Sequence, residues 1–144
     1  MDAVALDLDA VLADTRPLWR DWLEDAARRT RVQLDLPDDR AEAAALLDES
    51  LGDWRPLLER FAADRGPLHF RPRADTSASL RRLGGAGIRI GVFTDAPREL
   101  AEMALAHVGA ARRVTVVGSL EEVLRELGPG TVVVHSRAEL ADLQ

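Results

Sequence analysis

The segment AVALDLD, residues 3–9, is a short apolar run that acidic residues interrupt near its end. Such a run is typical of a buried strand in a parallel sheet, which presents polar side chains at its carboxyl end. Residues 3–8 are therefore predicted to form the first strand. Because side chains alternate along a strand, Asp7 and Asp9 are expected to project to the same side.

Two carboxylates placed so close together need a cation or a proton between them. Mg²⁺ is bound in proteins through one or two carboxylates together with phosphate oxygens, so the pair formed by Asp7 and Asp9 suits that ion. The alternative is a pair that caps a helix or is solvated at the strand end. A motif of two acids is short, and both interpretations stay open at this point.

Residues 14–73 are predicted to be helical. Apolar residues recur at helical spacing after Asp14, which is expected to cap the first helix. A second helix is predicted after the turn PDD, residues 37–39, and a third after Asp53. Residues 65–73 contain Gly-Pro and Arg-Pro pairs and are predicted to form a linker. The helical segment is expected to touch the rest of the chain mainly near Asp14 and Arg73.

From residue 75 the pattern changes to alternating helices and strands, with further strands predicted at residues 88–93, 114–117 and 131–134. This order predicts right-handed crossovers and a parallel sheet covered by helices on both faces. The predicted fold class is α/β, a doubly wound Rossmann-like parallel sheet. Its core is residues 1–13 and 74–144, and residues 14–73 are a small helical insertion after strand one.

The second predicted strand ends in FTD, residues 93–95. The Thr94 hydroxyl and the backbone N–H groups that run toward Pro97 are able to cradle a phosphate at a helix N-terminus. Asp95 also fits the simpler role of N-cap for that helix, and the two interpretations are compatible. Sheets of this class bind ligands at the carboxyl ends of their strands, where Asp7 and Thr94 are both predicted to lie.

Composition excludes several classes of function. The formal net charge of −6 and the pI near 5.1 argue against non-specific nucleic acid binding, which needs clustered positive charge. The chain has no cysteine, so disulfides and thiolate chemistry are excluded. No signal peptide or membrane span is expected, and a cytoplasmic location is the default. All 19 basic residues are arginine, so no lysine takes part in any reaction.

The sequence resembles the haloacid dehalogenase-like hydrolases. DLDAVL at residues 7–12, GVFTD at residues 91–95 and the helical segment between them carry the resemblance. It implies that Asp7 attacks a phosphoryl group to form an aspartyl-phosphate, that Asp9 acts as general acid and base, and that Thr94 holds the phosphate. It also implies Mg²⁺ as cofactor. Residues 14–73 resemble the family's small helical cap, which closes over the substrate.

Two of the family's motifs are altered. The family lysine near the third core segment has no counterpart, and only Arg112, Arg113 or Arg125 can replace it. The fourth motif is HSRAE, residues 135–139, where His135 replaces the first metal-binding acid and Glu139 keeps the second acidic position. The resemblance then assigns the site as follows: catalytic Asp7, Asp9, Thr94 and Arg112; phosphate-binding Thr94, Asp95 and Arg113; metal-binding Asp7, Asp9 through its backbone carbonyl, and Glu139.

Two hypotheses about function remain. The first is a Mg²⁺-dependent phosphatase that acts on a small phosphomonoester, a phosphorylated small molecule being the expected partner. The second is a catalytically impaired relative that binds a phosphorylated ligand or a protein partner. A phosphoacceptor receiver domain fits badly, because it needs a lysine and has no large helical insertion. The histidines His69, His107 and His135 show no spacing typical of metal ligands.

Overall fold

The computed structural model describes residues 1–143 and contains one four-stranded sheet. The strands are β1 (Ala3–Asp7), β2 (Arg89–Phe93), β3 (Val116–Gly118) and β4 (Thr131–Val134). All pairs are parallel, and the strand order is β3-β2-β1-β4. The predicted α/β class with a parallel Rossmann-like sheet is confirmed.

Strand β1 lies inside the sheet, between β2 and β4, and its residues from Ala3 to Leu6 are fully buried. The register pairs Asp7 with Phe93, and Phe93 with Gly118. The carboxyl ends of β1, β2 and β3 therefore meet at one edge of the sheet. This alignment brings the residues that follow the three strands into one neighbourhood.

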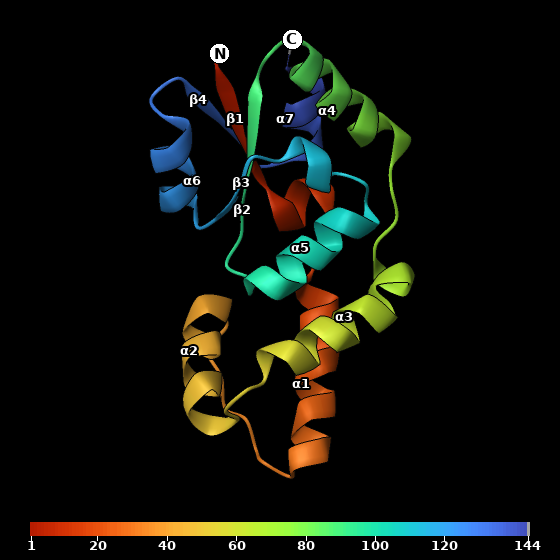
Figure 1. Cartoon of the computed structure of the whole chain (residues 1–144), viewed down its shortest axis with the longest axis vertical. Coiled ribbons are helices and arrows are strands. Elements are labelled where there is room, and N and C mark those ends of the chain that lie inside the picture. The colour runs from red at the N-terminus through yellow and green to blue at the C-terminus, as the bar shows by residue number, and fades with distance from the viewer. Residues whose placement is uncertain (144) are drawn as a thin grey trace.

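Helices cover both faces of the sheet (Figure 1). On one face, α6 (Leu120–Leu127) packs Val123 and Leu127 against Ala3 and Ala5. The other face is covered by α4 (Ala74–Gly85), α5 (Arg98–His107) and α7 (Arg137–Asp142). Ser119 and Glu122 form the predicted capping box of α6, each side chain accepting from the other's backbone N–H.

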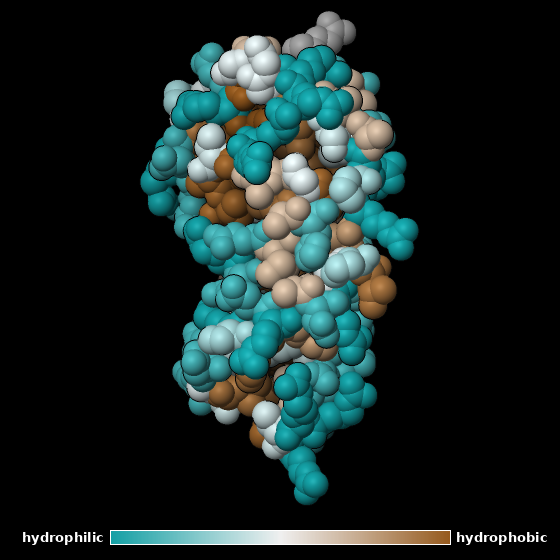
Figure 2. Space-filling model, turned by 45° about the vertical axis from the view of Figure 1, so that its right-hand side comes forward, coloured by the Kyte–Doolittle hydropathy of each residue, from teal (hydrophilic) through white to brown (hydrophobic). Residues whose placement is uncertain are grey.

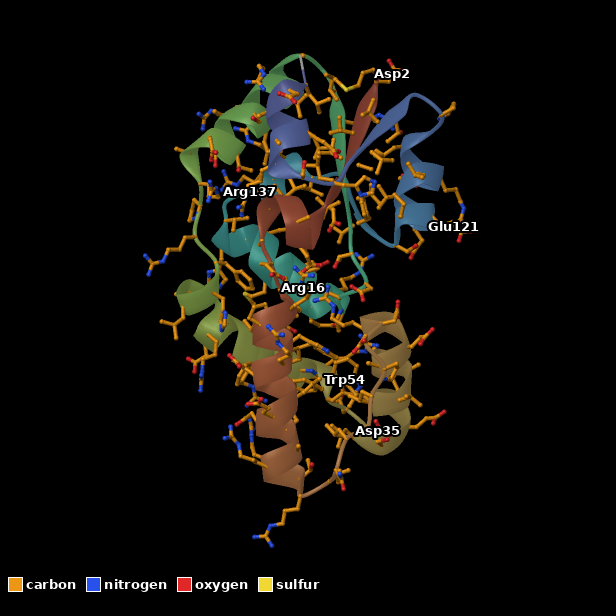
Figure 3. All side chains as sticks on the ribbon, turned by 180° about the vertical axis from the view of Figure 1, so that it is seen from behind. Asp2, Arg16, Asp35, Trp54, Glu121 and Arg137 are labelled. Atoms are coloured by element: carbon orange, nitrogen blue, oxygen red, sulfur yellow. The ribbon has the colours of Figure 1, made fainter. Side chains whose placement is uncertain are left out.

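The chain leaves β1 through a π-helical turn, η1 (Leu8–Leu12), and then forms α1 (Arg16–Thr30), α2 (Arg40–Ser50) and α3 (Arg55–His69). These three helices pack around a cluster of tryptophans, in which the ring centroids of Trp19 and Trp22 are 5.5 Å apart and those of Trp22 and Trp54 are also 5.5 Å apart. Figure 3 shows Trp54 among the three helices. Figure 2 shows a notch in the surface between this helical part and the part that holds the sheet.

The predicted linker at residues 65–73 is wrong in its first half, because α3 continues through Gly66 and Pro67 to His69. Gly66 faces α5 so closely that a Cβ atom there would lie 2.3 Å from His107 Nε2. Packing of α3 along α5 outweighs the local turn chemistry. The helical segment therefore contacts the sheet part along α3 and α5 as well as at its two connections.

Two predicted helix caps are shifted by one residue. The N-cap of α1 is Thr15 rather than Asp14, and that of α3 is Trp54 rather than Asp53. Neither N-cap residue makes a side-chain capping hydrogen bond, because the Thr15 hydroxyl is engaged with Asp9 and Arg40 and the indole N–H of Trp54 can only donate. None of the helices within residues 1–143 is long and apolar enough to cross a membrane.

The close packing of α6 on β2 yields a stability prediction at Gly91. An added Cβ would lie 2.6 Å from Val123 Cγ1 and 2.8 Å from Leu127 Cδ1, which is too close. We expect Gly91→Ala to lower the free energy of unfolding by about 1–3 kcal/mol, measured by chemical denaturation. Gly84→Ala is the control, since its nearest neighbour is Arg113 Nη1 at 3.7 Å. Equal stability of the two variants would contradict the packing described.

Candidate active site

Asp7 is the last residue of β1 and caps the turn that follows it. Its Oδ1 accepts hydrogen bonds from the backbone N–H groups of Asp9 at 3.1 Å and Ala10 at 3.4 Å. Its Oδ2 has no hydrogen-bond partner within residues 1–143. The turn thus holds one oxygen of the carboxylate and leaves the other without a protein partner, in a residue that lines the cavity described below.

Asp9 lies in the π-helical turn, and four donors surround its carboxylate. Oδ1 accepts from the backbone N–H of Thr15 at 2.8 Å and from the Thr15 hydroxyl at 2.6 Å. Oδ2 accepts from Arg40 Nη2 at 2.6 Å and from the Thr94 hydroxyl at 3.1 Å. Its side chain is 11% exposed, so these donors take the place of most of the water that would otherwise solvate it.

Thr94 and Asp95 follow β2 and lie beside the end of β1. The Thr94 hydroxyl, which donates to Asp9, also accepts from the backbone N–H of Ala96 at 3.1 Å. Both Asp95 oxygens accept from Arg40: Oδ2 from its backbone N–H at 2.9 Å, and Oδ1 from Nε at 3.0 Å and Nη2 at 2.7 Å. Asp95 does not cap α5, whose N-cap is Pro97 without a side-chain cap.

Arg40 is the most buried of the site residues that the sequence pattern did not predict, which also include Thr15. It is the first residue of α2, which Asp39 caps, and its guanidinium contacts Asp9, Thr15, Thr94 and Asp95. A cation in the first turn of a helix opposes the helix dipole. An arginine at the start of a helix, directly after the PDD turn, was therefore the sign in the sequence that its side chain is held by partners elsewhere.

The Arg40 contacts also set the charge of Asp95. Burial acts to raise the pKa of Asp95, but hydrogen bonds from the Arg40 side chain and backbone lower it, and so does the Arg40 charge. The net result is a pKa below the usual value for aspartate. Asp95 is therefore an anion at neutral pH and shares the guanidinium with Asp9.

These groups line a cavity of about 740 Å³ between the strand ends and the helical segment. Asp7 and Asp9 both line it, and so does Arg40 of the helical segment. Its rim includes Arg16, seen at the start of α1 in Figure 3, and Arg98 of α5. Both rim arginines pair with acids on their own helix or its flank, Arg16 with Asp14 at 2.8 Å and Arg98 with Glu102 at 3.4 Å.

Arg112 and Arg113, the predicted catalytic and phosphate-binding arginines, do not line this cavity. They lie exposed on η2 (Ala111–Arg113), a short 3-10 turn that precedes β3. A residue before a parallel strand lies at the opposite edge of the sheet from the carboxyl ends. Arg125 does not line the cavity either, since it is exposed on α6 and pairs with Glu121.

Glu139 is not brought together with Asp7 and Asp9 as a metal site. Within residues 1–143, no group of three or more histidine, aspartate or glutamate side chains is arranged to hold a metal ion. Glu139 lies exposed in the first turn of α7, and its Oε2 accepts from the His135 backbone N–H at 2.8 Å. The carboxylate is thus used locally to fix the end of β4.

No family model matches the chain, and no curated protein sequence matches it. Solved structures do match. CbbY from Rhodobacter sphaeroides, solved in complex with phosphate, is 17% identical with a TM-score of 0.69, and the match covers 92% of this chain and 76% of CbbY. A Thermotoga maritima protein described as a "putative beta-phosphoglucomutase" is 18% identical with a TM-score of 0.57, covering 98% of this chain and 80% of that one.

Both neighbours are members of the haloacid dehalogenase-like superfamily. The chain has the haloacid dehalogenase-like fold. The resemblance inferred from DLDAVL and GVFTD is therefore confirmed for the fold. In this haloacid dehalogenase-like fold, the helical segment departs from the sheet directly after β1, so that its helix α2 can reach back to the strand ends through Arg40.

The ion pairs of Asp95 predict a pH dependence of stability. Because the pKa of Asp95 is lowered in the folded chain, its contribution is present above the unfolded pKa and is lost as pH falls through the folded pKa. We expect Asp95→Asn to be less stable than the native chain at neutral pH, with the difference shrinking below about pH 4. Thermal unfolding across pH measures this. Asp38→Asn, at an exposed residue, is the control; a pH-independent difference would contradict the assignment.

Proposed function

We propose that the chain is a phosphatase that hydrolyses a small phosphomonoester, with Asp7 as the nucleophile. The proposal rests on the hydrogen bonds and the position of Asp7. Asp7 Oδ1 is held by the turn that follows β1, Oδ2 has no hydrogen-bond partner within residues 1–143, and the side chain lines the same cavity as Thr94. A carboxylate aimed in this way is suited to nucleophilic attack. The neighbour CbbY, which holds phosphate in its crystal structure, supports the substrate class.

In the first step, which Asp9 enters in its protonated form, an Asp7 oxygen attacks phosphorus as the bond from phosphorus to the leaving oxygen breaks, and the leaving oxygen takes the proton from Asp9. In the second step, water attacks the phosphorus of the aspartyl-phosphate and gives its proton to Asp9. The bond between Asp7 and phosphorus then breaks, which frees inorganic phosphate, restores the Asp7 carboxylate and leaves Asp9 protonated for the next cycle. The Thr94 hydroxyl, which donates to Asp9 in this structure, would turn to donate to a phosphoryl oxygen when substrate is bound.

Mg²⁺ is proposed as cofactor. Asp7 is the side chain available to hold it, because Asp9 is occupied by Arg40 and Glu139 by the His135 backbone. One carboxylate with phosphate oxygens and water suits Mg²⁺, with the Asp9 carbonyl as a further oxygen ligand. The donors therefore fit the ion when phosphate is bound. Mg²⁺ would supply positive charge to the phosphoryl oxygens.

Residues 14–73 are proposed to act as a cap over this site. Arg16 and Arg40 come from this segment and line the cavity together with residues of the strand ends. A cap excludes water from the reacting groups and selects the substrate by shape. The size of the cavity, about 740 Å³, suits a small molecule.

Turnover of an aryl phosphate in the presence of Mg²⁺ tests the proposal. We expect Asp7→Asn to lower kcat by more than about a hundredfold, because the variant lacks the nucleophile. Asp53→Asn, at an exposed residue outside the cavity, is expected to keep the native rate. If the native chain binds inorganic phosphate but turns over no phosphomonoester, the second hypothesis, a phosphate-binding relative without activity, replaces this proposal. The dispersal of the acids expected in the metal site favours that hypothesis.

Mg²⁺ binding is expected to depend on phosphate. By calorimetry, we expect the native chain to bind Mg²⁺ weakly alone and more tightly with inorganic phosphate, since phosphate oxygens complete the ligand set. Asp7→Asn should lose this coupling. His135→Asp should tighten the binding of Mg²⁺ alone, because it restores an acid beside Phe93, whose ring centroid lies 5.9 Å from that of His135. Equal affinities with and without phosphate would show that the ligand set is misassigned.

A further inference from the structure

Arg40 is the only charged residue that is buried within residues 1–143, with 3% of its surface exposed. It lies on α2, yet its guanidinium reaches the carboxyl ends of β1 and β2, where the residues of the proposed reaction lie. Asp9 is 31 residues away in sequence and Asp95 is 55 residues away. The mechanism above gives Arg40 no role, and an ionised side chain is rarely buried without one.

Each nitrogen of the guanidinium already donates to an acceptor of the protein. Nε donates to Asp95, Nη1 donates to Thr15 Oγ1 at 2.6 Å, and Nη2 lies within hydrogen-bond distance of Asp9, Asp95 and Thr94. A guanidinium has about five N–H groups in a rigid fork. With every nitrogen engaged, Arg40 is poorly placed to bind phosphate, and it is well placed to hold its neighbours.

Two of those neighbours take part in the proposed reaction. Arg40 Nη2 contacts Asp9 Oδ2 at 2.6 Å, and the Thr94 hydroxyl donates to the same oxygen at 3.1 Å. The third, Asp95, ties Arg40 to the loop that carries Thr94 by three hydrogen bonds. Displacement of the guanidinium would leave two partly buried carboxylates without their common cation and would let both side chains turn.

We propose that Arg40 is a positioning residue, which aims the Asp9 carboxylate and the Thr94 hydroxyl and so makes the reaction at Asp7 depend on the docking of α2. This inference rests on the proposed function. Because Arg40 acts through Asp9 and Thr94 and does not touch the phosphoryl group, its loss acts on the chemical step and leaves substrate affinity nearly unchanged. Small errors in the position of reacting groups slow a reaction by up to about a hundredfold.

The variants are Arg40→Met, which removes the charge and the fork, and Arg40→Lys, which keeps the charge alone. Arg81→Met is the matched control, because Arg81 is exposed on α4 and does not line the cavity. We expect Arg40→Met to lower kcat for an aryl phosphate by about 10- to 100-fold, with KM and the inhibition constant of inorganic phosphate within about twofold of native. Arg40→Lys should recover little of kcat, since an ammonium group cannot span the same acceptors.

Two outcomes would overturn the proposal. A rise in KM and in the phosphate inhibition constant at native kcat would make Arg40 a phosphate-binding residue. A native kcat in Arg40→Lys would show that charge alone suffices. If Arg40→Met does not fold, the same comparison is made on Arg40→Lys, in which a lowered kcat at native KM supports the positioning role.

Hydrogen exchange separates this proposal from the proposed function. In both Arg40 variants we expect faster amide exchange at residues 39–44 and 94–96 than in Arg81→Met, with exchange in α6 unchanged. A native chain without turnover would end the proposed function. The exchange result would still decide whether Arg40 docks α2 on the strand ends, and unchanged exchange at residues 94–96 would refute that.

Discussion

Burial of β1 carries two carboxyl groups to the rim of the hydrophobic core, where each needs hydrogen-bond donors in place of water. Asp7 obtains them from the backbone of its own turn. Asp9 cannot do so, and its donors come from Thr15, Thr94 and Arg40, on three separate segments of the chain. The hydrogen bonds of Asp9 thus join the helical segment to the ends of β1 and β2.

The parts of this structure that follow from local patterns could be predicted from the sequence. Apolar runs with turn residues between them are sufficient to indicate the parallel strands. The order of strands places their carboxyl ends together, so that Asp7, Asp9, Thr94 and Asp95 were expected at one edge, and the structure places them there. The capping box of Ser119 and Glu122 is local in the same sense and was also predicted.

The remaining parts depend on contacts between distant residues. Arg40 meets Asp95 across 55 residues, and no spacing rule encodes such a pair. Gly66 and Pro67 have the composition of a turn, but the close approach of Gly66 to His107 keeps them helical. Arg112 and Arg113 were placed by analogy with a lysine motif, although residues before β3 lie at the opposite edge of the sheet from Asp7.

The charge of the chain bears on how a phosphorylated substrate would reach this site. A net charge of −6 repels a phosphate dianion at long range, and salt screens that repulsion beyond about 8 Å. Attraction must then come from groups close to the cavity. Arg16 and Arg98 stand at its rim with more than half of each side chain exposed, whereas Arg40 is enclosed among the acids. Arg16 and Arg98 are therefore accessible to an incoming anion. Arg40 instead balances the charge of the carboxylates around it.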